Sequence, residues 1–219
     1  MEQRTDEWKQ ARCGKITASR WYDIFSTTKT GYAASRANYA SELACERLTG
    51  IPSEHYVSKD MERGTERESG ARVAYEMITG NLVEEVAFID HPKIPMCGAS
   101  PDGLIGSDGG LEIKCPNPTT HFKLLTGGAI DQSYVYQMVG GMMCTGRTWW
   151  DFCDYNPDYP DNLQIFIKRF YLKDFAVNQI EEGLRKFNDE VNIMVEKLLK
   201  VRVDESAEEY LCHGYSAGR

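Results

Sequence analysis

The chain has 219 residues, a mass of 24.9 kDa and a formal net charge of −8, with 42% hydrophobic and 26% charged residues. These values are typical of a single soluble globular domain and exclude a disordered chain, a collagen and a coiled-coil rod. The acidic balance argues against a nucleic-acid partner, because phosphate binding favours a basic surface.

The first part of the chain, residues 1–80, is predicted to be mainly helical, with breaker residues between the helical patterns. Helices are expected at 6–10, 17–25, 32–48 and 60–78. The cap of the second helix is either Thr17 or Ser19. The polar stretch 26–31 (STTKTG) is expected to be a loop.

The middle of the chain, residues 81–172, changes to the patterns of strands and is predicted to form the sheet core. One helix is expected there, at 131–143. Strands are expected at 82–89, 94–97, 104–105, 111–115, 148–155 and 163–171. The tetrapeptide SDGG at 107–110 is typical of a turn between two neighbouring strands.

The last part of the chain carries the clearest helical pattern. Apolar residues recur at steps of three and four from Phe175 to Leu198, which predicts an amphipathic helix at 173–201. An acidic tail follows, with DESAEE at 204–209. Together these elements predict one α/β domain over residues 1–219, a central mixed sheet flanked by helices.

The sequence also gives an expectation about compartment. No apolar run approaches the ~20 residues of a membrane-spanning helix, and the charged start MEQRTDEWKQ has no signal-peptide core. Seven cysteines in a chain without an export signal are expected to be reduced. We therefore expect a cytoplasmic protein that has no membrane contact.

One stretch carries the strongest functional signal, SPDGL at 100–104 and GLEIKCP at 110–116. Asp102 lies in a turn before a short strand, while Glu112 and Lys114 lie two residues apart on the next strand and so share a face. If the two strands pair, Asp102 and Glu112 converge. Two neighbouring carboxylates are tolerable when a cation lies between them, and hard oxygen ligands favour Mg²⁺ or Mn²⁺.

The same residues have an ordinary structural interpretation. Pro-Asp-Gly is a common turn, and Glu-x-Lys is common on the solvated face of a strand. Apolar residues flank each acidic residue here, which favours a functional site over a solvated face. A lysine beside two such carboxylates can position or activate a water and stabilise charge on a phosphate.

The spacing Pro-Asp-x₉-Glu-x-Lys resembles the PD-(D/E)xK nuclease superfamily, whose core is restriction-endonuclease-like. The fuller string resembles the phage λ exonuclease family of viral recombination nucleases. Further segments similar to that family are ARCGKITAS at 11–19, GTERESGAR at 64–72 and YVYQM at 134–138. The resemblance runs from about residue 8 to residue 155.

The resemblance implies roles for the residues that match the strand motif. Asp102 and Glu112 are implied to be metal ligands, with the backbone carbonyl of Ile113 as a third ligand. Lys114 is implied to position or deprotonate the attacking water. Gln137 is implied to orient that water or a phosphate from the helix behind the sheet.

Glu68 is implied to assist catalysis through a metal or its water. Glu66 is its rival, because the two side chains would point about 160° apart on a helix and only one can face the site. We choose Glu68, since the alignment of Ala71 and Arg72 fixes the register.

Arg12, Ser19 and Ser100 are implied to hold the 5′-terminal phosphate of the cut strand, a role for which arginine and helix-start donors are suited. Ser19 has the alternative role of a helix cap. The family's basic loop is represented here only by Lys29, so contacts from that loop stay open.

The resemblance implies a Mg²⁺-dependent 5′→3′ exonuclease, for which Mn²⁺ can substitute. It would degrade one strand of linear double-stranded DNA to 5′-mononucleotides and generate 3′ overhangs for recombination. The implied partners are DNA ends, a single-strand annealing protein and two further copies of the chain in a homotrimeric ring. A ring needs positive charge only along its channel, so the net charge of −8 does not exclude it.

Two other functions stay open at this point. One is a site-specific or structure-specific DNA endonuclease on the same fold. The other is a catalytically silent module that binds DNA ends. An iron–sulfur cluster is not expected, because Cys144, Cys153 and Cys212 are too dispersed.

Overall fold

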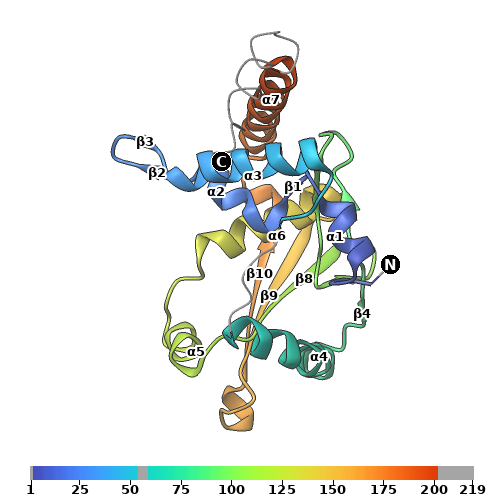
Figure 1. Cartoon of the computed structure of the whole chain (residues 1–219). Helices are drawn as coiled ribbons and strands as arrows, with labels where there is room; N and C mark the ends of the chain where they lie inside the picture. Colours follow the sequence, from blue (N-terminus) through green and yellow to red (C-terminus); the bar gives the residue numbers. More distant parts are fainter. Residues whose placement is uncertain (1, 54–58, 202–219) are drawn as a thin grey trace, which may run out of the picture.

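A five-stranded mixed sheet in the order β10-β9-β8-β7-β4 forms the centre of the computed structural model (Figure 1), which describes residues 2–53 and 59–201. Its strands are β4 (Val83–Glu84), β7 (Gly103–Ile105), β8 (Gly109–Lys114), β9 (Trp149–Tyr155) and β10 (Ile165–Tyr171). The neighbours β8 and β9 run parallel, and the other pairs of this sheet are antiparallel. The acidic segment 204–209 lies outside the described residues.

Helices surround this sheet in agreement with the expected pattern. They are α1 (Asp6–Arg12), α2 (Trp21–Phe25), α3 (Ala34–Thr49), α4 (Lys59–Thr79), α5 (Pro118–Leu125), α6 (Gln132–Thr145) and α7 (Val177–Val201), with short 3₁₀ turns η1 (Ala18–Arg20), η2 (Asp161–Leu163) and η3 (Leu172–Asp174). Local signals set their ends: Thr5 caps α1 by accepting from the Trp8 N–H, and α3 stops at Gly50, whose φ is +68°.

The two faces of the sheet are covered by different helices. On one face, α6 packs against β8 and β9, and its Met138 joins Trp150 and Phe152 in the larger core. On the other face, α4 packs on the same strands, and its Tyr75 joins Leu111 in a smaller core. Figure 1 shows α3 and α7 near one end of the long strands and α4 and α5 near the other.

Two small sheets complete the fold. One has the order β1-β6-β5, formed by β1 (Ile16–Thr17), β6 (Cys97–Ala99) and β5 (Ile89–Asp90). The other is the hairpin β2 (Thr27–Thr28) and β3 (Gly31–Tyr32), which projects from the body in Figure 1. Within the described ranges, no helix combines the length and apolarity needed to cross a membrane.

Several sequence-based expectations were wrong in detail. The expected loop at 26–31 contains the hairpin β2–β3, and the expected strand at 82–89 is divided between β4 and β5, which belong to different sheets. The strand expected at 94–97 lies later, as β6. Helix α5 was not among the helices expected from the sequence.

Candidate active site

The hairpin β7–β8 brings the motif carboxylates together. Gly103 pairs with Leu111, so Asp102 stands opposite Glu112 when this antiparallel register continues by one residue. Asp102 Oδ2 accepts a hydrogen bond from the backbone N–H of Ile113 at 2.7 Å. Lys114 Nζ lies 2.6 Å from Glu112 Oε1. Asp102, Glu112 and Lys114 therefore form one connected group.

The Trp150 ring packs closely on β8 and helps to bury this group. Glu112 is 1% exposed, and it lines a small cavity together with Trp150 of β9. A side chain at Gly110 would place its Cβ 2.3 Å from the Trp150 ring, so only glycine allows this close approach. The site consequently combines ionisable groups with a wall that keeps out much of the water.

Burial changes the charge behaviour of both carboxylates. It raises the pKa of Glu112 to about 8, an effect increased by the nearby charge of Asp102. It also raises the pKa of Asp102 to about 6, against the attraction of Lys114. Burial favours neutral Lys114, but Glu112 and Asp102 outweigh this and raise the Lys114 pKa, so the amine stays protonated.

The donor set fits a hard divalent cation. Two carboxylates that repel each other in a buried position are relieved by a cation between them. Among the residues described, no group of three or more His, Cys, Asp or Glu side chains is arranged to hold a metal. The available protein ligands are Asp102, Glu112 and the Ile113 carbonyl. So few protein oxygens suit Mg²⁺, because this ion keeps several of its bound water molecules.

Glu68 reaches a cavity of about 610 Å³ beside this group, lined also by Asp102 and Lys114. Its carboxylate forms ion pairs with Arg4 and, at 3.5 Å, with Arg72. Its charge raises the pKa of Asp102 and Glu112 further, so it lies within electrostatic range of both.

Glu66 is exposed and is not among the residues that line this cavity. Of the two rival glutamates, the structure therefore turns Glu68 towards the motif group.

Helix α6 brings two side chains to Lys114. Gln137 Oε1 accepts from Lys114 Nζ at 3.5 Å, and the Tyr134 ring lies 4.9 Å from the same nitrogen. Tyr134 in turn stacks on Phe152 of β9, with ring centroids 5.9 Å apart. The aromatic contact of Tyr134 was missed by the sequence reasoning, although the residue lies in the quoted segment YVYQM.

The three residues expected to hold a phosphate line a cavity that also reaches the motif carboxylates. Arg12, Ser19 and Ser100 line a cavity of about 180 Å³ together with Asp102, Glu112 and Gln137. We call this the catalytic cavity.

Ser100 joins two N-terminal side chains within it. Arg12 Nη1 donates to Ser100 Oγ at 2.8 Å, and Trp8 Nε1 donates to the same oxygen at 3.0 Å. The Arg12 guanidinium also stacks 4.2 Å from the Trp8 ring. Neither Trp8 nor Arg4, another lining residue, was singled out from the sequence.

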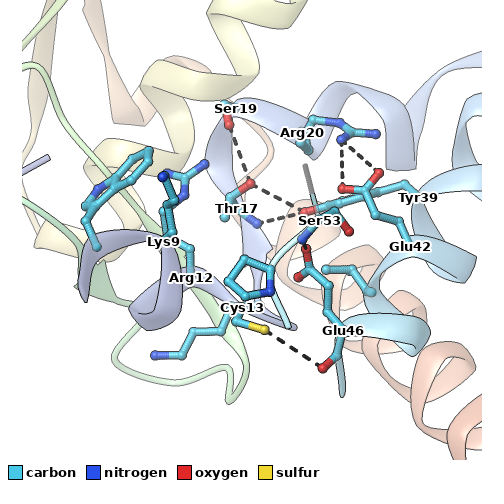
Figure 2. A pocket seen from close by; sticks show the side chains of 14 residues that line it. Lys9, Arg12, Cys13, Thr17, Ser19, Arg20, Tyr39, Glu42, Glu46 and Ser53 are labelled. Carbon is cyan, nitrogen blue, oxygen red and sulfur yellow. Dashed lines mark hydrogen bonds and ion pairs between the residues drawn. The ribbon is translucent and has the colours of Figure 1, made fainter. Parts of the chain in front are cut away.

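The expected capping role of Thr17 and Ser19 is not found. Thr17 precedes η1 without a side-chain cap, and α2 begins after Arg20. Ser19 lies inside η1, with its hydroxyl 3.4 Å from that of Thr17 (Figure 2). Lys29 lies in the projecting hairpin and is not among the residues that line the catalytic cavity.

The chain is similar to known proteins in sequence and in fold. Residues 7–148 match the model of the YqaJ-like viral recombinase domain. The crystal structure of an alkaline exonuclease, LHK-Exo from Laribacter hongkongensis, is similar at 44% sequence identity and a TM-score of 0.83, covering 90% of this chain and 98% of that one. The structure of LHK-Exo in complex with dAMP gives the same values.

A phage-related exonuclease from Haemophilus somnus 129PT has 12% identity, a TM-score of 0.65 and coverage of 84% and 96%, a likeness that concerns the fold alone. The comparison with curated proteins found no match. The expected α/β class, a restriction-endonuclease-like PD-(D/E)xK core with a mixed sheet flanked by helices, is confirmed.

Proposed function

The chain belongs to the YqaJ-like viral recombinase family, and from this membership we propose that it is a metal-dependent 5′→3′ exonuclease acting on linear double-stranded DNA. This agrees with the resemblance to the λ exonuclease family. One observation carries the proposal: the Asp102–Glu112–Lys114 group and the Arg12–Ser100 pair lie on the same catalytic cavity or at its edge. An anion-binding arginine thus lies next to a hydrolytic centre.

Arg12 is suited to select the DNA end. Within the described part of the chain it has no ion pair with a carboxylate, so its guanidinium is available to a phosphate. Ser19 and Ser100 add hydroxyl groups to the same cavity wall. A 5′-terminal phosphate held there places the following phosphodiester towards Asp102 and Glu112, which defines the 5′→3′ polarity.

The proposed reaction is hydrolysis of that phosphodiester. Water attacks phosphorus, and the bond from phosphorus to the O3′ of the terminal nucleotide breaks. The released 5′-mononucleotide gains a 3′-hydroxyl, while the shortened strand keeps the 5′-phosphate. Each cycle therefore regenerates the group that Arg12 binds and lengthens the 3′ overhang of the other strand.

The protein side chains have separate parts in this reaction. Lys114 stays protonated beside the two carboxylates, so it donates hydrogen bonds to the water or to a phosphate oxygen. Gln137 orients the Lys114 amine through its amide oxygen. Glu68 tunes the charge of the site from its position between Arg4 and Arg72.

Asp102, Glu112 and the Ile113 carbonyl would hold the divalent ion, which we propose to be Mg²⁺, with Mn²⁺ as a substitute. When bound, such an ion polarises the scissile phosphate and lowers the pKa of water. A cation there would offset the burial and the neighbouring negative charge that raise the pKa of Asp102 and of Glu112.

The remaining parts of the proposal concern assembly and cellular context. They are a homotrimeric ring around the duplex, a single-strand annealing protein as partner in recombination, and action in the cytoplasm. Exposed apolar side chains on and just after α4, namely Val73, Met77, Ile78 and Leu82, supply a surface of the kind that subunit contacts bury. Analytical ultracentrifugation with and without duplex tests the trimer.

The decisive experiment compares an end-labelled linear duplex with a closed circle, in Mg²⁺ and in EDTA. Labelled mononucleotide released first from the 5′ end of the linear duplex supports the proposal. Cutting of the closed circle would replace it with an endonuclease, and binding of ends without any hydrolysis would replace it with a silent end-binding module.

A further inference from the structure

A third cavity, of about 410 Å³, adjoins the catalytic cavity at Arg12. We call it the flanking cavity (Figure 2). Trp8, Arg12 and Ser19 line both cavities, whereas Asp102 and Glu112 line only the catalytic one. The shared residues therefore separate the flanking cavity from the hydrolytic centre.

The lining of the flanking cavity favours an anion. Lys15 and Arg20 add cationic groups to that of Arg12, and Lys9 lies at the rim with its side chain 54% exposed. Lys15 is paired at 2.6 Å with Asp90, whose side chain is 65% exposed and so can turn to solvent.

One of the cavity's acidic groups, Glu46, already accepts hydrogen bonds from the backbone. Glu46 accepts backbone hydrogen bonds at both oxygens, from Gly14 at 2.6 Å and from Ser53 at 2.7 Å. In Figure 2, Glu46 and Glu42 lie opposite Arg12 across the cavity. Glu42 is oriented by Arg20, 3.3 Å away.

The wall that carries Arg12 is held rigidly. Gly14 has a φ of +69°, and a Cβ there would lie 2.8 Å from the Arg47 side chain. Arg47 Nε donates to the Gly14 carbonyl at 2.8 Å, while Glu46 accepts from the Gly14 N–H. The cavity is therefore a preformed space, and its volume lies within the range of roughly 300–1,000 Å³ typical of small-molecule sites.

We propose that the flanking cavity binds a second phosphate group, joined on the 5′ side of the phosphate that Arg12 holds. This inference rests on the proposed function, because it assumes that Arg12 holds the terminal phosphate. Arg12 lies between the hydrolytic group and the flanking cavity. Any extension on the 5′ side of the phosphate that Arg12 holds therefore enters the flanking cavity.

Two kinds of DNA end present this chemistry. In a 5′-triphosphate end, the α-phosphate lies at Arg12 and the β- and γ-phosphates enter the cavity. In a one-nucleotide 5′ overhang, the internal phosphodiester lies at Arg12 and the extra nucleotide enters.

Hydrolysis breaks the same bond to O3′ in both cases. The first product is then a nucleoside 5′-triphosphate from the first end and a 5′-phosphorylated dinucleotide from the second. Each released product gains a 3′-hydroxyl, and the shortened strand keeps the 5′-phosphate.

The test uses the full chain with Mg²⁺ and three otherwise identical linear duplexes: a blunt 5′-monophosphate end, a blunt 5′-triphosphate end and a one-nucleotide 5′ overhang. Mass spectrometry of the first products is expected to show an intact nucleoside triphosphate or dinucleotide from the extended ends. The arm that gives the extended product identifies the source of the second phosphate.

A charge-reversal variant connects the result to the cavity. Lys15→Glu is expected to lower the rate on the productive extended end, relative to the monophosphate end, by about five- to tenfold. Lys93→Glu is the matched control, because Lys93 also pairs with one acidic residue, Glu181 at 3.4 Å, but is not among the residues lining the cavity. Its rate ratio is expected to stay unchanged.

Resistance of both extended ends, or release of only mononucleoside monophosphate from them, overturns the inference. Equal changes of the rate ratio in the two variants also overturn it. The monophosphate arm separates this failure from a failure of the proposed function, because absence of digestion there contradicts the exonuclease itself.

Discussion

Replacement of Asp102 by asparagine is expected to abolish hydrolysis and at the same time to stabilise the metal-free protein. Burial and the nearby charge of Glu68 both disfavour the charge of this carboxylate and raise its pKa, against the attraction of Lys114. Asparagine keeps the shape, and its amide oxygen can still accept from the Ile113 N–H, which now lies 2.7 Å from Asp102 Oδ2. Only the negative charge is lost.

The size of the stability gain follows from the pKa of Asp102. Burial raises it to about 6 from an ordinary value of 3.8, a difference that corresponds to about 3 kcal/mol when the group is ionised in both states. Since water reaches part of the site, we expect about 1–3 kcal/mol at pH 8. Because the pKa is raised, stability is lost as pH rises from about 3.8 to about 6. The advantage of Asp102→Asn should therefore be complete above pH 6, fall to about half at pH 5, and vanish below the unfolded pKa of 3.8.

The assay is urea unfolding in EDTA at pH 8 and pH 5, with hydrolysis of a linear duplex in Mg²⁺ measured in parallel. Asp151→Asn is a matched control on the neighbouring strand. Asp151 is 2% exposed, but Arg169 donates to it at 2.7 and 2.8 Å and Tyr75 donates at 2.6 Å. Removal of this compensated charge should lower stability by about 2 kcal/mol.

The idea that the Asp102 charge destabilises the metal-free protein would be refuted if Asp102→Asn unfolded at a lower urea concentration than the wild type, in EDTA at pH 8. Hydrolysis at the wild-type rate would refute its catalytic role. Mg²⁺ should also stabilise the wild type more than the variant, because the variant has lost one anionic ligand.

Three further variants test other parts of the site. Lys114→Ala should lower the initial rate on a labelled linear duplex by at least ~10²–10³, and near-normal digestion would contradict the assigned role. Arg12→Ala should remove the preference for 5′-phosphorylated over 5′-hydroxyl ends; a surviving preference in paired rate measurements would place the phosphate elsewhere. His121→Asn should lower the free energy of unfolding by about 2–3 kcal/mol, because the buried ring forms hydrogen bonds with Asp154 and, at 2.7 Å, with the Leu163 carbonyl. A change in urea denaturation below about 0.5 kcal/mol would contradict this stabilising role.

The catalytic hairpin could be predicted because its information is local. The turn SDGG sets the register of β7 and β8, and alternation along β8 then fixes which side chains share a face. Leu111 lies in the smaller core while Glu112 faces the catalytic cavity, as that alternation requires. Proximity of Asp102 to Glu112 follows from these two facts.

Helix α5 was missed although its start signals are in the sequence. Asn117 caps the helix by accepting from the Thr120 N–H at 2.9 Å, and Pro118 occupies the first turn. Proline is favoured at that position because it has no N–H to leave unpaired. A proline pair around an asparagine can therefore mark a helix start as well as a break.

Other errors arose from tertiary pairing. Val83 pairs with Ile105 and Ile89 pairs with Ala99, so one apolar stretch serves two sheets, and nothing in its pattern specifies the partners. Ile94 begins the stretch expected to be a strand, but it is buried in a turn where His91 accepts a hydrogen bond from its N–H at 3.2 Å. In the sequence, a buried apolar residue in a turn therefore cannot be distinguished from a residue of a buried strand.

The net charge of −8 is compatible with DNA cleavage because the charge of the site depends on its cation. The catalytic cavity and the adjoining cavity near Glu68 are lined by four cationic side chains, Arg4, Arg12, Arg63 and Lys114, and by three acidic ones, Glu68, Asp102 and Glu112. When all seven groups are ionised these charges nearly cancel, so the cleft attracts a phosphate only weakly. A divalent ion adds two positive charges at the point where the scissile phosphate must lie. Attraction of DNA to this site is then linked to metal binding, and no large basic surface is required.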